Sequence, residues 1–360
     1  MKSNDYQPIW YQRNRPFAKF SKQSLSQYGS TGKALQEIQE RIVREWNSAI
    51  DLKKVDTNNI CIDLMPETSL AFYYGAFAAH GYNLFSFTEQ VGEMLAHTKA
   101  DEVPISALKS PYPVYFVQFH KSILWGGLEI TGAYVIDDDA IPALQICLVL
   151  NPLDPSAHWM SSPCGYFYLP LPKHSELGLG ALIQHTIDNE IVGKWAVATS
   201  SMPIENYSSI DVREQRARRE TMDLSSGRAA IQEAMEYLAN CLCYLSSHQR
   251  FKQNYPFDAP SALTDKAMSS QTMRQKQKAQ SQLGSMGYHL ITYIRLESDI
   301  AGGKSSAVNV PSGKKQHWRR GHWRNQRKGV ELSECSLIWI RPTLVGDIKH
   351  DDSLREYRLS

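Results

Sequence analysis

The sequence has little that would place the protein outside the cytoplasm. Its 360 residues include six cysteines but no Cys-x-x-Cys pair. Most of these cysteines lie in apolar stretches, where a thiol packs as a small hydrophobic group, so we expect reduced, buried thiols. The first residues contain no apolar signal-peptide core, and no run is apolar for long enough to cross a bilayer. The sequence therefore predicts a cytoplasmic protein with no membrane partner.

Common enzyme signatures are also missing from the sequence. It contains no Walker-type phosphate loop, no Gly-x-Gly-x-x-Gly after a strand, no Gly-x-Ser-x-Gly turn and no His-Glu-x-x-His helix. Asp137, Asp138 and Asp139 follow one another between two strand-like runs, which favours a turn over a divalent-cation site. We therefore expect no metal and no cofactor, and a protein that acts by binding is favoured over a small-molecule enzyme.

Acidic residues are missing from one stretch near the C-terminus. Between Pro311 and Val330 the chain carries seven lysines and arginines and no aspartate or glutamate. Subtracting these seven charges from the net charge of +2 leaves about −5 for the rest of the chain. The overall content of 42% hydrophobic and 21% charged residues is that of a soluble globular protein with a sizeable core. The uneven charge predicts that a partner binds at this stretch.

Helical periodicity marks five stretches of the chain. Apolar residues recur there every three or four positions, which predicts amphipathic or buried helices. The stretches are residues 30–52, residues 66–81, a short segment after Glu89, residues 175–198 and residues 227–250. Ser30 or Thr31 is a candidate N-cap, and Ser86 and Glu89 have the Ser-x-x-Glu spacing of a capping box. Residues 1–28 are polar with scattered aromatic side chains, so we expect an irregular arm.

Short runs rich in Val, Ile, Tyr and Phe predict strands in the middle and at the end of the chain. They lie at residues 112–119, 129–136, 143–150, 165–169, 288–296 and 337–340. Because only short turns separate the first four runs, we expect these strands to be antiparallel. Residues 251–286 are rich in Ser, Gln and Lys and contain few large apolar residues, which predicts a linker or long loop.

These patterns together predict an α+β protein. We expect N-terminal helices, a central antiparallel sheet flanked by helices, and a C-terminal strand pair bearing a basic aromatic loop. The predicted divisions are an α+β body at residues 1–250, a linker or long loop at residues 251–286, and the C-terminal strands with the basic loop at residues 287–360.

Aromatic rings are interleaved with the cations of the basic stretch. Cations neutralise phosphates and flat rings stack on unpaired bases, so this composition predicts contact with single-stranded RNA or with a partner. The candidate contact residues are Lys314, Lys315, His317, Trp318, Arg319, Arg320, His322, Trp323, Arg324, Arg327 and Lys328. The stretch lies between two predicted strands, and we expect a rigid loop or hairpin from which Trp318 and Trp323 face outward.

Other interpretations of the basic stretch remain open on the sequence alone. His317 and His322 could act as the general acid and base of an RNase, since the pKa of histidine lies close to neutral pH. Alternatively, Trp318 and Trp323 fold back onto the sheet and the cations form a solvated rim. A zinc site is disfavoured because the two histidines have no neighbouring Cys, Asp or Glu at ligand spacing.

Several motifs of the chain resemble a known family. The run His-Trp-Arg-Arg-Gly-His-Trp at residues 317–323, followed by Ile-Trp-Ile-Arg-Pro at 338–342 and by Leu344 and Val345, resembles the C-terminal signature of the type V-A anti-CRISPR proteins carried by phages and plasmids. Tyr-Gly-Ala-Phe at 74–77 and the helical stretch at 235–245 are similar to that family as well. The resemblance implies an inhibitor that acts in a bacterial host cell. Such an inhibitor recognises the N-terminal polypeptide of a CRISPR nuclease at the ribosome and brings about loss of its mRNA.

The leading hypothesis is therefore a non-enzymatic inhibitor encoded by a mobile element. It would bind a host CRISPR effector nuclease, or its nascent polypeptide, and contact RNA or the ribosome through the basic stretch. One alternative is the RNase that uses His317 and His322. The other is a structural or interaction protein of a phage or plasmid without RNA affinity.

Overall fold

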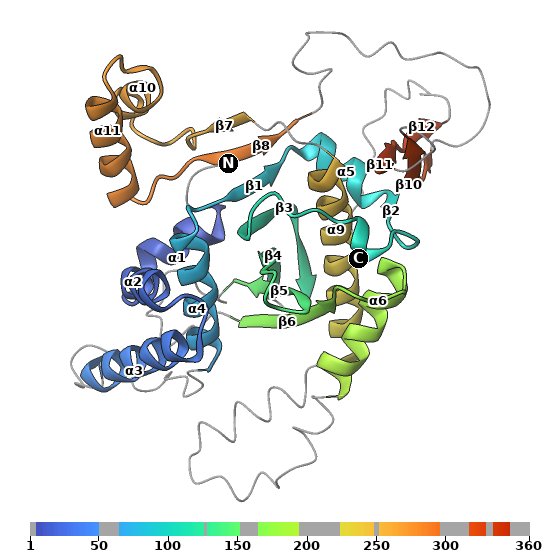
Figure 1. Cartoon of the computed structure of the whole chain (residues 1–360), viewed down its shortest axis with the longest axis horizontal. Coiled ribbons are helices and arrows are strands. Elements are labelled where there is room, and N and C mark those ends of the chain that lie inside the picture. Colours follow the sequence, from blue (N-terminus) through green and yellow to red (C-terminus); the bar gives the residue numbers. More distant parts are fainter. Residues whose placement is uncertain are drawn as a thin grey trace, which may run out of the picture.

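A seven-stranded sheet forms the centre of the protein (Figure 1). The computed structural model describes residues 5–49, 65–125, 128–151, 165–193, 224–247, 252–295, 317–328 and 334–345. Strands follow the order β6-β5-β4-β3-β1-β8-β7 across the sheet. Their bounds are β1 Leu84–Phe87, β3 Val114–Trp125, β4 Leu128–Ile136, β5 Ala143–Leu150, β6 Gly165–Pro172, β7 Lys252–Asn254 and β8 Ile291–Ile294.

The sheet is mixed, which corrects the expectation of a purely antiparallel one. Strands β3 to β6 pair antiparallel in sequence order, as their short connections predicted. Strand β1, however, runs parallel to both of its neighbours, β3 and β8. The chain leaves β1 through helix α5 (Glu89–Ala96) before it returns in β3, and a helical crossover is the usual connection between parallel strands. All four residues of β1 are buried, so the strand shows no alternating pattern that would reveal it in the sequence.

Helices cover both faces of the sheet and create two hydrophobic cores. Val114 and Phe116 of β3 belong to one core, while Tyr115 and Val117 belong to the other, because successive side chains of a strand point to opposite faces. The first core packs under α1 Gln7–Asn14, α2 Ala18–Tyr28, α3 Gly32–Ala49 and α4 Met65–Ala79. The second packs under α5, α6 Leu179–Ile187 and α9 Leu224–Ser247. The α+β class is therefore confirmed, with the sheet between two helical layers (Figure 1).

The N-terminal segment is helical, which corrects the expectation of an irregular arm. Ile9 and Tyr11 of α1 and Leu25 of α2 are buried in the same core as α4, so the scattered apolar residues there are core residues. Arg15 has an extended backbone between the two helices, as expected for a residue that precedes a proline. Because this break separates two short helices, no single long periodic pattern marks the segment in the sequence.

The predicted helices are present, with corrections at their ends. Helix α3 begins after Thr31, whose hydroxyl accepts a hydrogen bond from the Ala34 amide at 3.5 Å, as expected of an N-cap. Ser86 lies in β1, and the N-cap of α5 is Thr88, so the predicted capping box is wrong. Helix α6 continues as a π-helix, η4 (Asp188–Gly193), at the end of the described segment.

Residues 252–286 fold into regular structure, which corrects the expectation of a linker or long loop. Strand β7 pairs with β8, and helices α10 (Ser261–Ser269) and α11 (Met273–Ser285) form a hairpin beside it (Figure 1). Ala267, Ala279 and Leu283 form a small core with Tyr255. Small side chains at helical spacing suffice for this packing, so the low content of large apolar residues gave the wrong expectation.

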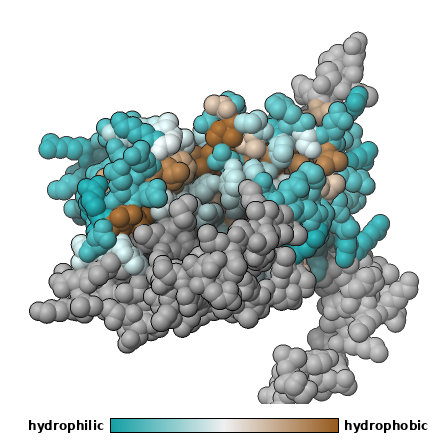
Figure 2. Space-filling model, turned by 90° about the horizontal axis from the view of Figure 1, so that it is seen from below, coloured by the Kyte–Doolittle hydropathy of each residue, from teal (hydrophilic) through white to brown (hydrophobic). Residues whose placement is uncertain are grey.

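Most of the described surface visible in Figure 2 is hydrophilic. In Figure 2 hydrophobic residues lie in small groups among hydrophilic ones. No described helix is long and apolar enough to cross a membrane.

Cys147, Cys241 and Cys243 are buried free thiols, and burial raises the pKa of each. Cys335, in contrast, is exposed, and Cys61 and Cys164 lie outside the described residues.

The triple-aspartate segment is a turn, as predicted. The Asp138 carboxylate accepts a hydrogen bond from the Ala140 amide at 2.9 Å, which is the side-chain contact of an Asx turn. Asp137 forms an ion pair with Lys173 at 2.7 Å. Within the described segments no group of three or more His, Cys, Asp or Glu side chains could hold a metal ion.

Candidate functional site

The described part of the basic stretch, residues 317–328, is mostly strand, which agrees with the expected hairpin and not with a loop. Strand β9 (His317–Arg319) pairs with β12 (Thr343–Val345), and β10 (Gly321–Lys328) pairs antiparallel with β11 (Glu334–Ile340). The start of β10 also pairs with β2 (Thr98–Lys99), which follows α5. We call β9 to β12 the basic ribbon. It lies beside α5 and β2 at one end of the molecule (Figure 1).

Side chains alternate between two environments along β10. His322 and Arg324 are exposed, whereas the intervening Trp323 is only 7% exposed. Across the ladder, His322 lies opposite Ile340 and Arg324 opposite Ile338. The two isoleucines are 40% and 41% exposed, so the outer face of the ribbon combines cations with apolar side chains.

Trp323 fastens the ribbon to the body of the protein. Its indole Nε1 donates a hydrogen bond to Asn240 Oδ1 of α9 at 2.8 Å, and its ring stacks on Trp339 of β11 with 5.8 Å between centroids. The Trp339 indole donates in turn to the Thr98 hydroxyl at 3.1 Å. The Asn240 amide donates to the Thr98 carbonyl at 3.0 Å, so the contacts join β10, β11, β2 and α9. The prediction that Trp323 faces outward to stack on bases is therefore wrong.

Gly321 lies tightly against the connection between β11 and β12, and its amide bonds to the end of α5. Its amide donates to the His97 carbonyl at 2.9 Å, at the point where the ribbon meets the end of α5. A Cβ atom at this position would lie 2.7 Å from Pro342 Cδ and 2.8 Å from the Ile340 carbonyl oxygen. Only glycine fits there without displacing the chain, so two residues of the resemblance motif, Gly321 and Trp323, hold the ribbon in place.

The arginines of the ribbon remain free to contact a ligand. Arg319, Arg320, Arg324 and Arg327 are exposed. In the described part of the chain, none of the four forms an ion pair with a carboxylate. Unpaired surface cations of this kind attract a polyanion and are not needed to balance the protein's own charge.

The other predicted contact residues are placed only in part. Lys314 and Lys315 lie outside the described residues. His317, Trp318 and Lys328 are described by their backbones alone, within β9 and β10. The proposed roles of these five residues therefore stay predictions, as does the acid–base pairing of His317 with the exposed His322.

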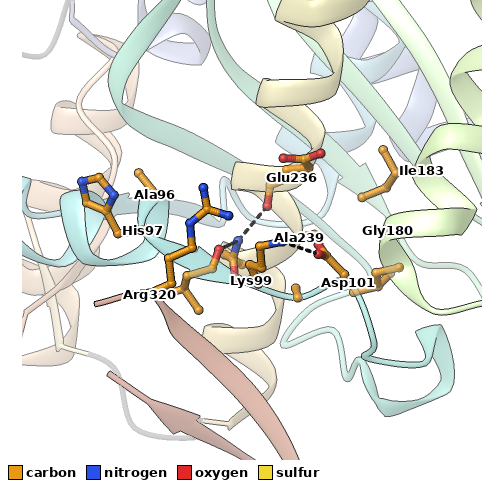
Figure 3. A pocket seen from close by; sticks show the side chains of 13 residues that line it. Ala96, His97, Lys99, Asp101, Gly180, Ile183, Glu236, Ala239 and Arg320 are labelled. Carbon is orange, nitrogen blue, oxygen red and sulfur yellow. Dashed lines mark hydrogen bonds and ion pairs between the residues drawn. The ribbon is translucent and has the colours of Figure 1, made fainter. Parts of the chain in front are cut away.

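A cavity of about 230 Å³ opens where the ribbon joins the body (Figure 3). Arg320 of the ribbon lines it, and the Arg320 side chain extends toward α9, the helix that carries Glu236. The other walls are the end of α5, β2 with the residues that follow it, the first turns of α6, and the middle of α9. Lys99 and Asp101 form an ion pair at 3.3 Å along this wall.

A second cavity, of about 340 Å³, adjoins the first, and both are lined by Ala96, His97, Thr98, Glu236 and Asn240. His120 of β3 lines it, and its Nδ1 lies 2.8 Å from the Tyr237 hydroxyl while its Nε2 lies 3.5 Å from Glu93. Burial lowers the pKa of His120, against the opposing effect of Glu93, so the ring is neutral at pH 7. We assign no chemistry to this group of residues.

Residues that hold the candidate site together were missed by the sequence analysis. Asn240 is buried in α9 between the buried Ala239 and Cys241, and its side chain bonds both to β2 and to the ribbon. A polar residue on an otherwise apolar helical stripe was the available signal. Thr98 gave no comparable signal, because β2 is only two residues long.

Comparisons with known proteins place the ribbon and the body in one family. Residues 85–347 match the AcrVA2-like family, described as the anti-CRISPR type V subtype A2 family. No curated protein sequence matches the chain. A solved structure described as the crystal structure of AcrVA2 is similar over 93% of this chain and 96% of that chain, with a TM-score of 0.44 and 12% sequence identity.

Proposed function

Because the chain belongs to the AcrVA2-like family of anti-CRISPR type V subtype A2 proteins, we propose that it suppresses the synthesis of a CRISPR effector nuclease. In this proposal the protein binds the nascent N-terminal polypeptide of the effector and contacts RNA or the ribosome through the basic ribbon. Both contacts occur in the cytoplasm of a bacterial host. The family match supports the choice of target, and the ribbon supports the contact with RNA.

The observation that carries the RNA contact is the set of unpaired arginines on the ribbon. Each phosphate that an arginine neutralises releases bound counterions, which makes such binding favourable and salt-dependent. The remainder of the chain is net negative, so a polyanion is attracted to this region and repelled elsewhere. Since Trp323 is buried, the contact depends on phosphates and on the outer face with His322 and Arg324, not on an exposed Trp323 indole.

Removal of two ribbon arginines is expected to weaken RNA binding and its salt dependence. In the double variant Arg319→Ala with Arg324→Ala, the slope of log K against log salt concentration becomes shallower by about 1.4, at about 0.7 per lost phosphate contact. The measurement is a titration of fluorescent single-stranded RNA at several salt concentrations. Because both side chains are exposed, the free energy of unfolding stays within about 0.5 kcal/mol of the parent value.

A matched control separates local contacts from net charge. Arg44→Ala with Arg274→Ala removes the same charge from exposed positions on α3 and α11, away from the ribbon. We expect this control to keep most of the affinity and the full salt slope. Equal losses in both double variants would contradict a ribbon-specific contact. No RNA binding in the parent would favour an interaction protein without RNA affinity.

The same assay distinguishes binding from cleavage. With the parent protein we expect labelled RNA to be bound in a salt-sensitive manner and to remain intact. Cleavage that disappears in His322→Ala would instead identify the RNase alternative, in which His317 and His322 act as general acid and base.

Recognition of the nascent polypeptide has its own test. The N-terminal segment of a type V-A nuclease is fused in frame to an unrelated reporter, and reporter mRNA is measured with and without this protein. A second fusion carries two compensating frameshifts around the segment, so that its mRNA is nearly unchanged while the encoded polypeptide differs. We expect mRNA loss only with the first fusion. Equal loss with both would show that the nucleotide sequence is recognised and not the polypeptide.

A further inference from the structure

The cavity beside Arg320 is continuous with the surface that is proposed to contact RNA. Arg320 follows β9 directly and is both an exposed cation of the ribbon and a lining residue of the cavity. His97 and Thr98 line the cavity as well. The Gly321 amide, next to Arg320 in the chain, donates a hydrogen bond to the His97 carbonyl and so holds the ribbon beside the cavity. A nucleotide whose phosphate lies at Arg320 therefore has its base within reach of the cavity.

The size and lining of the cavity fit one flat ring. Its volume of about 230 Å³ lies below the range of about 300–1,000 Å³ that is typical of pockets for drug-sized ligands. Leu179, Ile183 and Ala239 contribute apolar atoms to its walls, but they are only 1%, 2% and 4% exposed, so most of the surface that faces the cavity is polar. The polar part of the lining includes the carboxylates of Asp101 and Glu236 (Figure 3). A nucleobase is a flat ring with hydrogen-bonding groups along its edge, and the polar lining can pair with that edge.

The charges of the lining favour a base that carries an amino group. Lys99 is paired with Asp101, which leaves Arg320 as the cation among the described lining residues that is free to meet a phosphate. The Glu236 carboxylate accepts a hydrogen bond from Gln232 at Oε1 and has further acceptor capacity. Carboxylates accept hydrogen bonds from the exocyclic amino group of cytosine, whereas uracil has a carbonyl oxygen at that position. Asn240 does not contribute, because its amide is engaged with Thr98 and with the Glu236 carbonyl.

We propose that this cavity binds one unpaired, amino-bearing pyrimidine base of the RNA that the basic ribbon contacts, with Glu236 accepting from the amino group and Arg320 at the adjacent phosphate. The proposal rests on the proposed RNA contact of the ribbon. It assigns base recognition to the cavity, whereas the arginines of the ribbon supply affinity for any sequence. Trp323 contributes by holding Asn240 and the cavity wall in place.

The test compares short oligocytidine, oligouridine and oligocytidine with one abasic position as probes for the full-length protein. We expect the parent to bind oligocytidine more tightly than oligouridine by about tenfold, since one well-placed hydrogen-bonding contact to a base edge discriminates between bases to about this extent. The abasic position is expected to reduce affinity when it falls at the recognised nucleotide. An oligomer with the abasic position scanned along its length locates that nucleotide.

Two glutamates of α9 provide a matched pair of variants. Glu236 lines this cavity, and Glu233 lies one turn earlier, is exposed and does not line it. Glu236→Ala is expected to abolish the preference for oligocytidine and to weaken its binding, although removing a negative charge would otherwise strengthen binding to RNA. Glu233→Ala is expected to keep the preference and to bind both oligomers as tightly as the parent or slightly more tightly.

The outcomes separate the base pocket from the RNA contact itself. If Glu236→Ala strengthens binding to both oligomers as Glu233→Ala does, or if the parent shows no preference, the base pocket is overturned while salt-dependent binding to the ribbon stands. If the parent binds none of the probes, the RNA contact of the proposed function fails, and the base pocket fails with it. Because both glutamates are exposed, unfolding of either variant is not expected, and circular dichroism checks this.

Discussion

Trp323→Ala is expected to detach the basic ribbon from the body of the protein. Truncation of a buried tryptophan costs about 3–5 kcal/mol, from lost burial and the cavity left behind. The variant also leaves the Asn240 side-chain carbonyl without its indole donor and Trp339 without its stacking partner. Hydrogen exchange of the amides of β10 and β11 measures this local opening, and we expect their protection to fall far more than that of β3 to β5.

Trp323→Ala is also expected to weaken RNA binding, because the arginines of the ribbon are no longer held in position. Arg320 and Arg324 remain in the sequence of this variant, but the strand that aligns them is no longer held against α9 and β2. We expect RNA affinity to fall toward that of the Arg319→Ala, Arg324→Ala double variant. Trp323→Phe, which keeps a ring but not the indole donor, is expected to lose about 1–2 kcal/mol and to retain most of the binding.

His322→Ala is the control on the same strand. His322 is exposed on the opposite face of β10, so its truncation is expected to leave the exchange of the ribbon amides unchanged. Unchanged protection of β10 and β11 in Trp323→Ala would show that the pairing of the strands, without the indole, suffices to hold the ribbon.

Breaking the buried ion pair between Arg15 and Glu67 is expected to destabilise the N-terminal helical layer strongly. The two side chains are 2% and 1% exposed, with Nη2 of Arg15 3.2 Å from Oε1 of Glu67. The pair joins the α1–α2 junction to α4, and the Arg15 guanidinium also lies 4.9 Å from the Trp10 ring centroid. Glu67→Gln removes the negative charge that lies 3.2 Å from a buried guanidinium, which costs about 3–5 kcal/mol. Chemical denaturation followed by circular dichroism measures the change.

An exposed ion pair and a double variant test the physical cause. Arg41 and Glu45 of α3 form a pair whose side chains are 40% and 27% exposed. Glu45→Gln is expected to cost less than about 1 kcal/mol, since solvent screens the charges. Arg15→Met with Glu67→Leu, which removes both buried charges, is expected to recover much of the stability lost in Glu67→Gln. Equal effects of Glu45→Gln and Glu67→Gln would contradict an electrostatic cause.

The sequence predicted those helices and strands whose residues show a regular apolar pattern along the chain. The apolar periodicity of α3, α4 and α9 and the β-branched and aromatic runs of β3 to β6 are readable because each element buries a regular face. The α10–α11 hairpin was missed because its faces are built from small residues such as Ala267 and Ala279. The strand β1 was missed because both of its faces are buried.

The candidate site was predictable in its composition but not in its orientation. The concentration of cations at residues 314–328 and the resemblance motif both indicate the ribbon from the order of residues alone. Which of its side chains face solvent depends on the pairing of β10 with β11 and β2, and β2 in particular is distant in the sequence. For this reason Trp323 is buried while its neighbour Arg324 is exposed.

The sequence by itself determined the family, the α+β class and the location of the positive charge, because these follow from the residue types and their local order. Only the tertiary structure decided that Gly321 and Trp323 anchor the ribbon, that Asn240 and Thr98 receive it, and that Arg320 borders a cavity. Those relations depend on contacts between residues as far apart as Thr98, Asn240 and Trp339, and the spacing of residues along a chain does not specify which distant strands and helices meet.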